Sequence, residues 1–168
     1  SVNVNFDTSG QEGMGSLQLL FLFILLAVGP TLLLMMTSFT RLVMVFSFLR
    51  SAIGLQQTPP NQVIIGLALF LSLFIMSPVM TEINNTSITP YMNGEISETE
   101  ALDKMQDPLK EFMLKQTKTE DLDLFISLAG DQPVIDEVST ESLMQLDMKV
   151  VVPAFITSEL KRAFMIGF

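Results

Sequence analysis

The stretch LQLLFLFILLAVGPTLLLMM, at residues 17–36, decides the fold class of this chain. Sixteen of its twenty residues are apolar, and about 20 such residues span a hydrocarbon core of roughly 30 Å. A second run, VIIGLALFLSLFIMSPVM at 63–80, has 14 apolar residues in 18. Neither run has the polar face of a surface helix. The alternative is two buried helices of a soluble core, but the remaining residues are too polar to cover them, so we expect membrane-type helices.

Charge is distributed unevenly along the 168 residues. Between Gly13 and Thr81 there is no acidic residue, and the bases are Arg41 and Arg50. From residue 82 onward lie 16 of the 18 acidic and 7 of the 9 basic side chains. The Lys and Arg rule for membrane topology places the connection 37–62 in the cytoplasm, and hence the acidic region 82–150 on the opposite side.

Composition excludes several classes of function. The absence of Cys and His removes disulfides, thiolate metal sites and Ser-His-Asp catalysis. A net charge of −9 argues against binding to a nucleic-acid backbone. The acidic region has no Asp-x-Asp-x-Asp-Gly calcium loop, and the glycines near the N-terminus do not follow a strand, as a nucleotide-binding fingerprint requires. We therefore expect a protein that is not an enzyme and needs no cofactor or metal.

The predicted fold is all-α, with membrane-type helical hairpins and an inserted small acidic helical domain. Its predicted parts are a polar tail at 1–16, an apolar hairpin at 17–81 with a turn at 54–62, the acidic domain at 82–150, and the start of a second hairpin at 151–168, which looks truncated before further apolar helices.

Local signals refine the acidic domain. Ser97 and Thr117 each precede a Glu by three residues, as in a capping box. Pro108 predicts a kink or a new helix start with Asp107 as N-cap. Gly130 predicts a helix end, and a short helix is expected at 139–148. The carboxylates lie outside the apolar stripes, so we expect them on a solvated face.

The last segment should form a helix with one apolar and one polar side. The polar side is expected to consist of Thr157, Ser158, Glu159, Lys161 and Arg162. Ser158 is expected to pair with Arg162, one turn further along.

Arg41 lies just beyond the first apolar run, and two interpretations are open. It can be a topogenic charge near the membrane surface. It can also be a contact inside an assembly, with acceptors from neighbouring subunits, because nearby sequence offers few. The chain has 12 Met, 13 Phe and no Trp, which suits packing against protein better than anchoring at a lipid interface. The candidate assembly contacts are Arg41, Arg50, Gln56, Gln57, Pro59, Pro60, Asn61 and Glu159.

Four blocks of sequence carry a family resemblance. They are LLLMMTSFTR at 32–41, GLQQTPPNQVIIGLALFLSLFIMSPV at 54–79, PLKEFMLKQT at 108–117 and VPAFITSELKRAFMIGF at 152–168. The chain resembles the FliP family, membrane components of the flagellar type III export apparatus in the bacterial inner membrane and flagellum basal body. Full-length members of that family continue with further apolar helices and a Met-rich loop, so we expect the gating residues to lie beyond Phe168.

The resemblance implies a structural role. Several copies of such a protein would assemble with FliQ and FliR into a gate for unfolded flagellar proteins, working with FlhB and FlhA, with residues 82–150 on the periplasmic side. Two alternatives remain open. One is the related injectisome export-gate subunit. The other is a subunit of a secondary transporter, since Gly29-Pro30 and Ser77-Pro78 interrupt the apolar runs as in transporter substrate sites.

Overall fold

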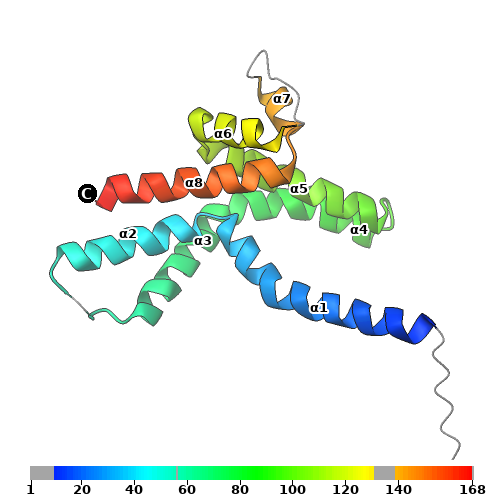
Figure 1. The fold of residues 1–168 in the computed structure, drawn as a ribbon, viewed down its shortest axis with the longest axis horizontal. Helices are drawn as coiled ribbons and strands as arrows, with labels where there is room; N and C mark the ends of the chain where they lie inside the picture. Colours follow the sequence, from blue (N-terminus) through cyan, green and yellow to red (C-terminus); the bar gives the residue numbers. More distant parts are fainter. Residues whose placement is uncertain (1–9, 56, 131–138, 168) are drawn as a thin grey trace, which may run out of the picture. The chain divides into compact units, whose positions relative to one another are not determined.

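The computed structural model describes the backbone of residues 10–55, 57–130 and 139–167, and side chains from residue 15 onward. Every regular element within these ranges is helical, which confirms the all-α prediction (Figure 1). The chain divides into two compact units, Ser1–Leu34 and Met35–Phe168.

The first unit consists of helix α1, Gly10–Met35. Its stretch Gly15–Met35 is long and apolar enough to cross a membrane, by length and composition. In the stretch Gly15–Met35, apolar side chains lie on all sides of the helix, so this stretch offers no polar face to water. Pro30 lies inside the helix without ending it.

The second unit begins with a helical hairpin, formed by α2, Phe39–Ala52, and α3, Asn61–Ile83 (Figure 1). Gly54 has a φ of +79°, a left-handed conformation that suits glycine after a helix C-terminus. The buried residues of α3 recur mostly every four positions, which places them on one side of the helix: Ile64, Ala68, Ser72, Met76 and Ile83.

Helix α3 continues without a break through a π-helical turn, η1, Asn84–Ile88, into α4, Thr89–Met92. The stretch Asn61–Met92 also meets the length and composition of a membrane span. The second half of α3 and η1 pack against α5. There the buried Ser87 hydroxyl donates to the carbonyl of Ala101 at 2.5 Å.

The acidic region forms three helices: α5, Glu98–Gln116; α6, Thr119–Ala129; and α7, Thr140–Met144. The Ser97 hydroxyl accepts from the Glu100 N–H, as its position before α5 predicts. Gly130 ends α6 at a φ of +72°, which confirms that helix end.

Three local predictions for this region are wrong. Pro108 lies buried inside the continuous helix α5 and does not start a new helix with Asp107 as N-cap, whereas a kink at Pro108 stays a prediction. Thr117 does not cap α6. Its hydroxyl donates back to the Met113 carbonyl, and Lys118 takes the N-cap position. The helix expected at 139–148 is only α7, since a new helix begins at Met148.

That last helix, α8, spans Met148–Gly167 and forms the centre of the second unit, packing against α2, α5 and α6 (Figure 1). Its first half supplies most of the hydrophobic core, which contains Met113, Leu122, Leu146, Val150, Val151, Ala154 and Phe155. The boundary expected between residues 150 and 151 therefore falls inside α8, and the one expected after residue 81 falls inside α3. The division into functional domains stays a prediction.

The second half of α8 lies against α2. The rings of Phe48 and Phe164 contact each other at a centroid distance of 5.6 Å and an interplanar angle of 54°. A Cβ added at Gly167 would lie 2.6 Å from the Phe48 ring, so the two helices meet here at a distance that only glycine allows.

Candidate functional site

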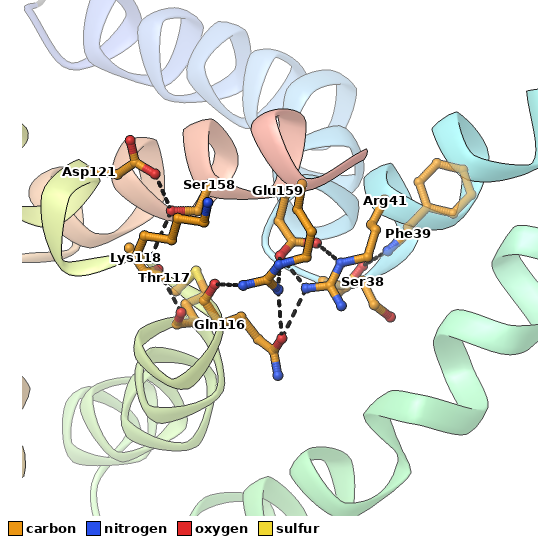
Figure 2. A network of polar contacts seen from close by, with 12 residues as sticks. Ser38, Phe39, Arg41, Gln116, Thr117, Lys118, Asp121, Ser158 and Glu159 are labelled. Atoms are coloured by element: carbon orange, nitrogen blue, oxygen red, sulfur yellow. Dashed lines mark hydrogen bonds and ion pairs between the residues drawn. The ribbon is translucent and has the colours of Figure 1, made fainter. Parts of the chain in front are cut away.

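Glu159 lies at the centre of a polar network where α2, α5 and α8 meet (Figure 2). Its side chain is only 1% exposed. The Arg41 guanidinium donates from Nε and Nη2 to the two carboxylate oxygens, a two-point contact that fixes both orientation and distance. A buried carboxylate needs such a partner, because an unpaired charge in the interior is strongly unfavourable.

Two further side chains complete this contact. Arg162 also donates to Glu159, at 3.3 Å. The Gln116 side-chain oxygen accepts from Arg41 at 2.9 Å and from Arg162 at 3.1 Å. Arg162 additionally donates to the Gln116 backbone carbonyl at 2.9 Å. The C-terminal end of α5 is thereby held to both α2 and α8.

The neighbouring residue Ser158 ties α6 to the same turn of α8 (Figure 2). Its hydroxyl accepts from the Lys118 N–H at 2.9 Å and donates to the Asp121 carboxylate at 2.6 Å. Asp121 is 1% exposed and also binds Lys161. We call the whole set, Arg41, Gln116, Lys118, Asp121, Ser158, Glu159, Lys161 and Arg162, the α8 junction.

Two opposing effects act on the pKa of the Asp121 carboxyl. Burial raises it. Hydrogen bonds from Lys161 and Ser158, with the charges of Lys161 and Lys118, outweigh burial and hold the pKa below its usual value. The carboxylate is therefore stabilised in its ionised form.

The junction corrects three predictions. Ser158 and Glu159, which were predicted on the polar side of the last helix, are buried. Ser158 pairs with Asp121 and Lys118, not with Arg162. Asp121 departs from the expectation that carboxylates of the acidic region face water, because α8 covers it.

The acceptors of Arg41 also lie elsewhere than predicted. They come from Gln116 and Glu159 of the same chain, although we expected a neighbouring subunit to supply them. The prediction that the connection 37–62 and the acidic region lie on opposite sides of a membrane stays a prediction. The role of Arg41 and Glu159 as assembly contacts stays a prediction.

The remaining candidate residues lie at the other end of α2. We call Arg50, Gln57, Pro59, Pro60 and Asn61 the hairpin tip; Gln56 lies outside the described residues. One nitrogen of Arg50, Nη1, donates to the Pro59 carbonyl at 3.1 Å and to the Asn61 side-chain oxygen at 2.7 Å. The structure therefore brings three of these residues together, and they close the turn between α2 and α3.

Sequence reasoning missed Gln116, Asp121, Ser158 and Arg162 as members of the junction. The sequence patterns place Asp121 on a solvated face and Ser158 and Arg162 on the polar side of the last helix, and they single out no role for Gln116. A signal was present in the last helix, where Ser158 and Glu159 follow Pro-Ala-Phe-Ile-Thr within one of the four blocks that carry the family resemblance.

Comparison with known proteins decides the family, since residues 22–168 match the FliP family. The chain belongs to the FliP family. The flagellar biosynthetic protein FliP of Bacillus subtilis (strain 168) is 47% identical over 165 residues, which cover 97% of this chain and 72% of the relative. That of Aquifex aeolicus (strain VF5) is 46% identical over 153 residues, covering 91% and 62%.

A third FliP protein, from Cereibacter sphaeroides, is 40% identical over 168 residues, which cover all of this chain and 54% of the relative. The FliP-family chain thus spans between about half and three quarters of the length of these relatives. The resemblance found in the sequence is confirmed. The two long apolar helices of this chain are consistent with a membrane-associated protein.

Proposed function

We propose that this chain is a structural subunit of the flagellar type III protein export gate. In this role several copies assemble with FliQ and FliR around a path for unfolded flagellar proteins, and FlhB and FlhA act with that gate. The subunit acts by its shape and by its contacts with other subunits, and this role requires no catalytic group from this chain.

The observation that carries the proposal, besides family membership, is the apolar surface that the hairpin leaves uncovered. Phe70 and Phe74 on α3 are 70% and 73% exposed, and Leu67 and Leu73 lie on the same helix with about half or more of their surface free. Contiguous exposed apolar surface of this kind is typical of a protein or membrane contact. The α8 junction beside it holds α2 in a fixed position relative to α5 and α8, which is what a subunit needs to present that surface.

We further propose that residues 82–150 lie on the periplasmic side, together with Arg41. The acidic region carries 15 acidic and five basic residues. The cytoplasmic leaflet carries a negative surface potential that would repel such a region. Because the chain has no cysteine, single cysteines at the exposed positions Glu95 and Asp103 give a clean test. We expect an impermeant thiol reagent to label both in intact spheroplasts. Labelling only after the membrane is breached would contradict this placement.

Assembly is tested by replacing Arg41. Arg41→Ala removes the two-point contact with Glu159 and should reduce the amount of FliQ-like and FliR-like chains that co-purify. Arg41→Lys should be partly defective, because an ammonium group cannot reproduce the two parallel hydrogen bonds. Lys104→Ala is the matched control, since it removes one charge from an exposed pair with Glu100. Normal recovery of partners with Arg41→Ala would refute the assembly role.

A further inference from the structure

Arg50, at the hairpin tip, carries a charge that no described residue of this chain neutralises. Both of its hydrogen bonds come from one nitrogen, Nη1, and both acceptors are neutral oxygens, of Pro59 and Asn61. Among the residues that the structure describes, Nε and Nη2 of Arg50 have no acceptor and no carboxylate forms an ion pair with it. The sequence has no acidic residue between Gly13 and Thr81, so the counter-charge has to come from outside the hairpin.

The unused edge of Arg50 is the one that binds anions at two points. Arg41 uses the same two nitrogens, Nε and Nη2, to hold both oxygens of Glu159. Carboxylate and phosphate oxygens fit this edge equally well. In Arg50 the bonds from Nη1 fix the plane of the guanidinium and leave the Nε–Nη2 edge available.

An open recess of about 440 Å³ adjoins this edge, lined by Arg50, Gln57, Pro60 and Asn61. The Asn61 side-chain oxygen already accepts from Arg50, so its NH₂ group remains as a donor. Asn61 is also the first residue of α3, where backbone N–H groups lack acceptors within the helix. A guanidinium, amide groups and free N–H groups together favour a negatively charged ligand with several oxygens.

The surroundings indicate the source of that ligand. The recess lies at the first residue of the apolar stretch Asn61–Met92. Large apolar side chains beside it are exposed: Leu49, Ile53, Leu55 and Val63. An apolar helix end that carries a single guanidinium places that group at the phosphate layer of a bilayer. We propose that the hairpin tip binds the phosphate group of an anionic phospholipid, with Arg50 as its two-point donor.

The test uses the full chain in nanodiscs made of equal parts phosphatidylglycerol and phosphatidylcholine. Native mass spectrometry after release counts the phosphatidylglycerol molecules that stay bound. We expect retention of phosphatidylglycerol to fall about fivefold in Arg50→Gln, since one basic residue near a membrane surface contributes about 1 kcal/mol. Lys104→Gln, which removes an exposed charge in the acidic region, should retain the wild-type amount.

Asn61→Asp preserves the hydrogen bond that closes the turn between α2 and α3, and it tests the role of the uncompensated charge of Arg50 without removing the guanidinium. The new carboxylate has the same shape, still accepts from Arg50, and neutralises it, so phosphatidylglycerol retention should also fall while circular dichroism stays unchanged. Wild-type retention in either tip variant would overturn the proposal. So would equal competition by inorganic phosphate at millimolar concentration, which would show a general anion site. Loss of co-purified partner chains with unchanged lipid retention would make the tip a protein contact, also against the proposal.

Discussion

Arg41 and Arg50 lie nine residues apart on α2, yet their surroundings are opposite. Arg41 meets a buried carboxylate and a side-chain amide, from helices that follow it by more than seventy residues in sequence. Arg50 meets only neutral oxygens from the adjacent turn. The comparison teaches that an arginine in an apolar segment acts according to what the rest of the fold brings to it. At the α8 junction the chain supplies the counter-charge, whereas at the hairpin tip none of the residues within the described ranges does.

The largest expected effect is at the junction. Glu159→Gln leaves Arg41 and Arg162 without their shared counter-charge in a buried site, which should lower the free energy of unfolding by about 3–5 kcal/mol. Denaturant unfolding of the purified chain in detergent, followed by circular dichroism, measures this. A loss of unfolding free energy below about 1 kcal/mol, the usual value of an exposed ion pair, would contradict the claim that the Arg41–Glu159 pair stabilises the fold more than Arg50 does.

Asp121 should show the next largest effect, and its effect should depend on pH. Its pKa is lowered in the folded chain, so the ionised form stabilises the fold at neutral pH. This stabilisation is present above the unfolded-state pKa of about 4 and is lost as pH falls through the lower folded-state value. Asp121→Asn should cost about 2 kcal/mol at neutral pH and less in acid. Unfolding curves for the wild type and the variant across that range test it; a pH-independent difference would contradict the ionised pairing.

Gly167 tests a contact that lies between Arg41 and Arg50 along α2, because Gly167 of α8 lies against Phe48 of α2. Gly167→Ala places a methyl group against the Phe48 ring, whose nearest carbon is 2.6 Å from that position. We expect a loss of about 1–2 kcal/mol from overpacking, recovered in part by adding Phe48→Leu. Gly66→Ala is the matched control, because nothing lies within 4 Å of its added Cβ. Equal destabilisation by the two substitutions would show that the contact with Phe48 is unimportant.

The smallest effect on stability should be at the tip. Arg50→Gln removes two hydrogen bonds to neutral oxygens in a partly exposed turn, so unfolding should change by about 1 kcal/mol or less. The same unfolding assay measures it. A loss as large as that of Glu159→Gln would mean that Arg50 stabilises the fold as Arg41 does.

Sequence patterns predicted several local features of this fold, although they failed at Thr117 and at the helix expected over 139–148. The apolar runs gave α1 and α3, Ser97 and Gly130 marked helix ends, and proline and glycine residues marked the turn after α2. These features depend on neighbouring residues, which a linear pattern contains.

The α8 junction could not be predicted in the same way. It joins Arg41 to Glu159 across 118 positions and Ser158 to Asp121 across 37. A polar side of a helix usually faces water, but Ser158, Glu159 and Asp121 lie on polar sides of their helices and face other helices. Which helices meet is decided by the packing of the core around Phe155, and periodicity alone does not contain that information.

A double-mutant cycle on Arg41 and Glu159 tests most directly whether this pair joins the hairpin to the acidic helices within one chain. Arg41→Met, Glu159→Gln and the double variant are unfolded in detergent, without other subunits present. The intrachain pair predicts that the double variant is about 1.5–3 kcal/mol more stable than the sum of the single losses implies. Additive losses, within about 0.5 kcal/mol, would show that the two side chains do not interact in the isolated chain and would contradict the α8 junction.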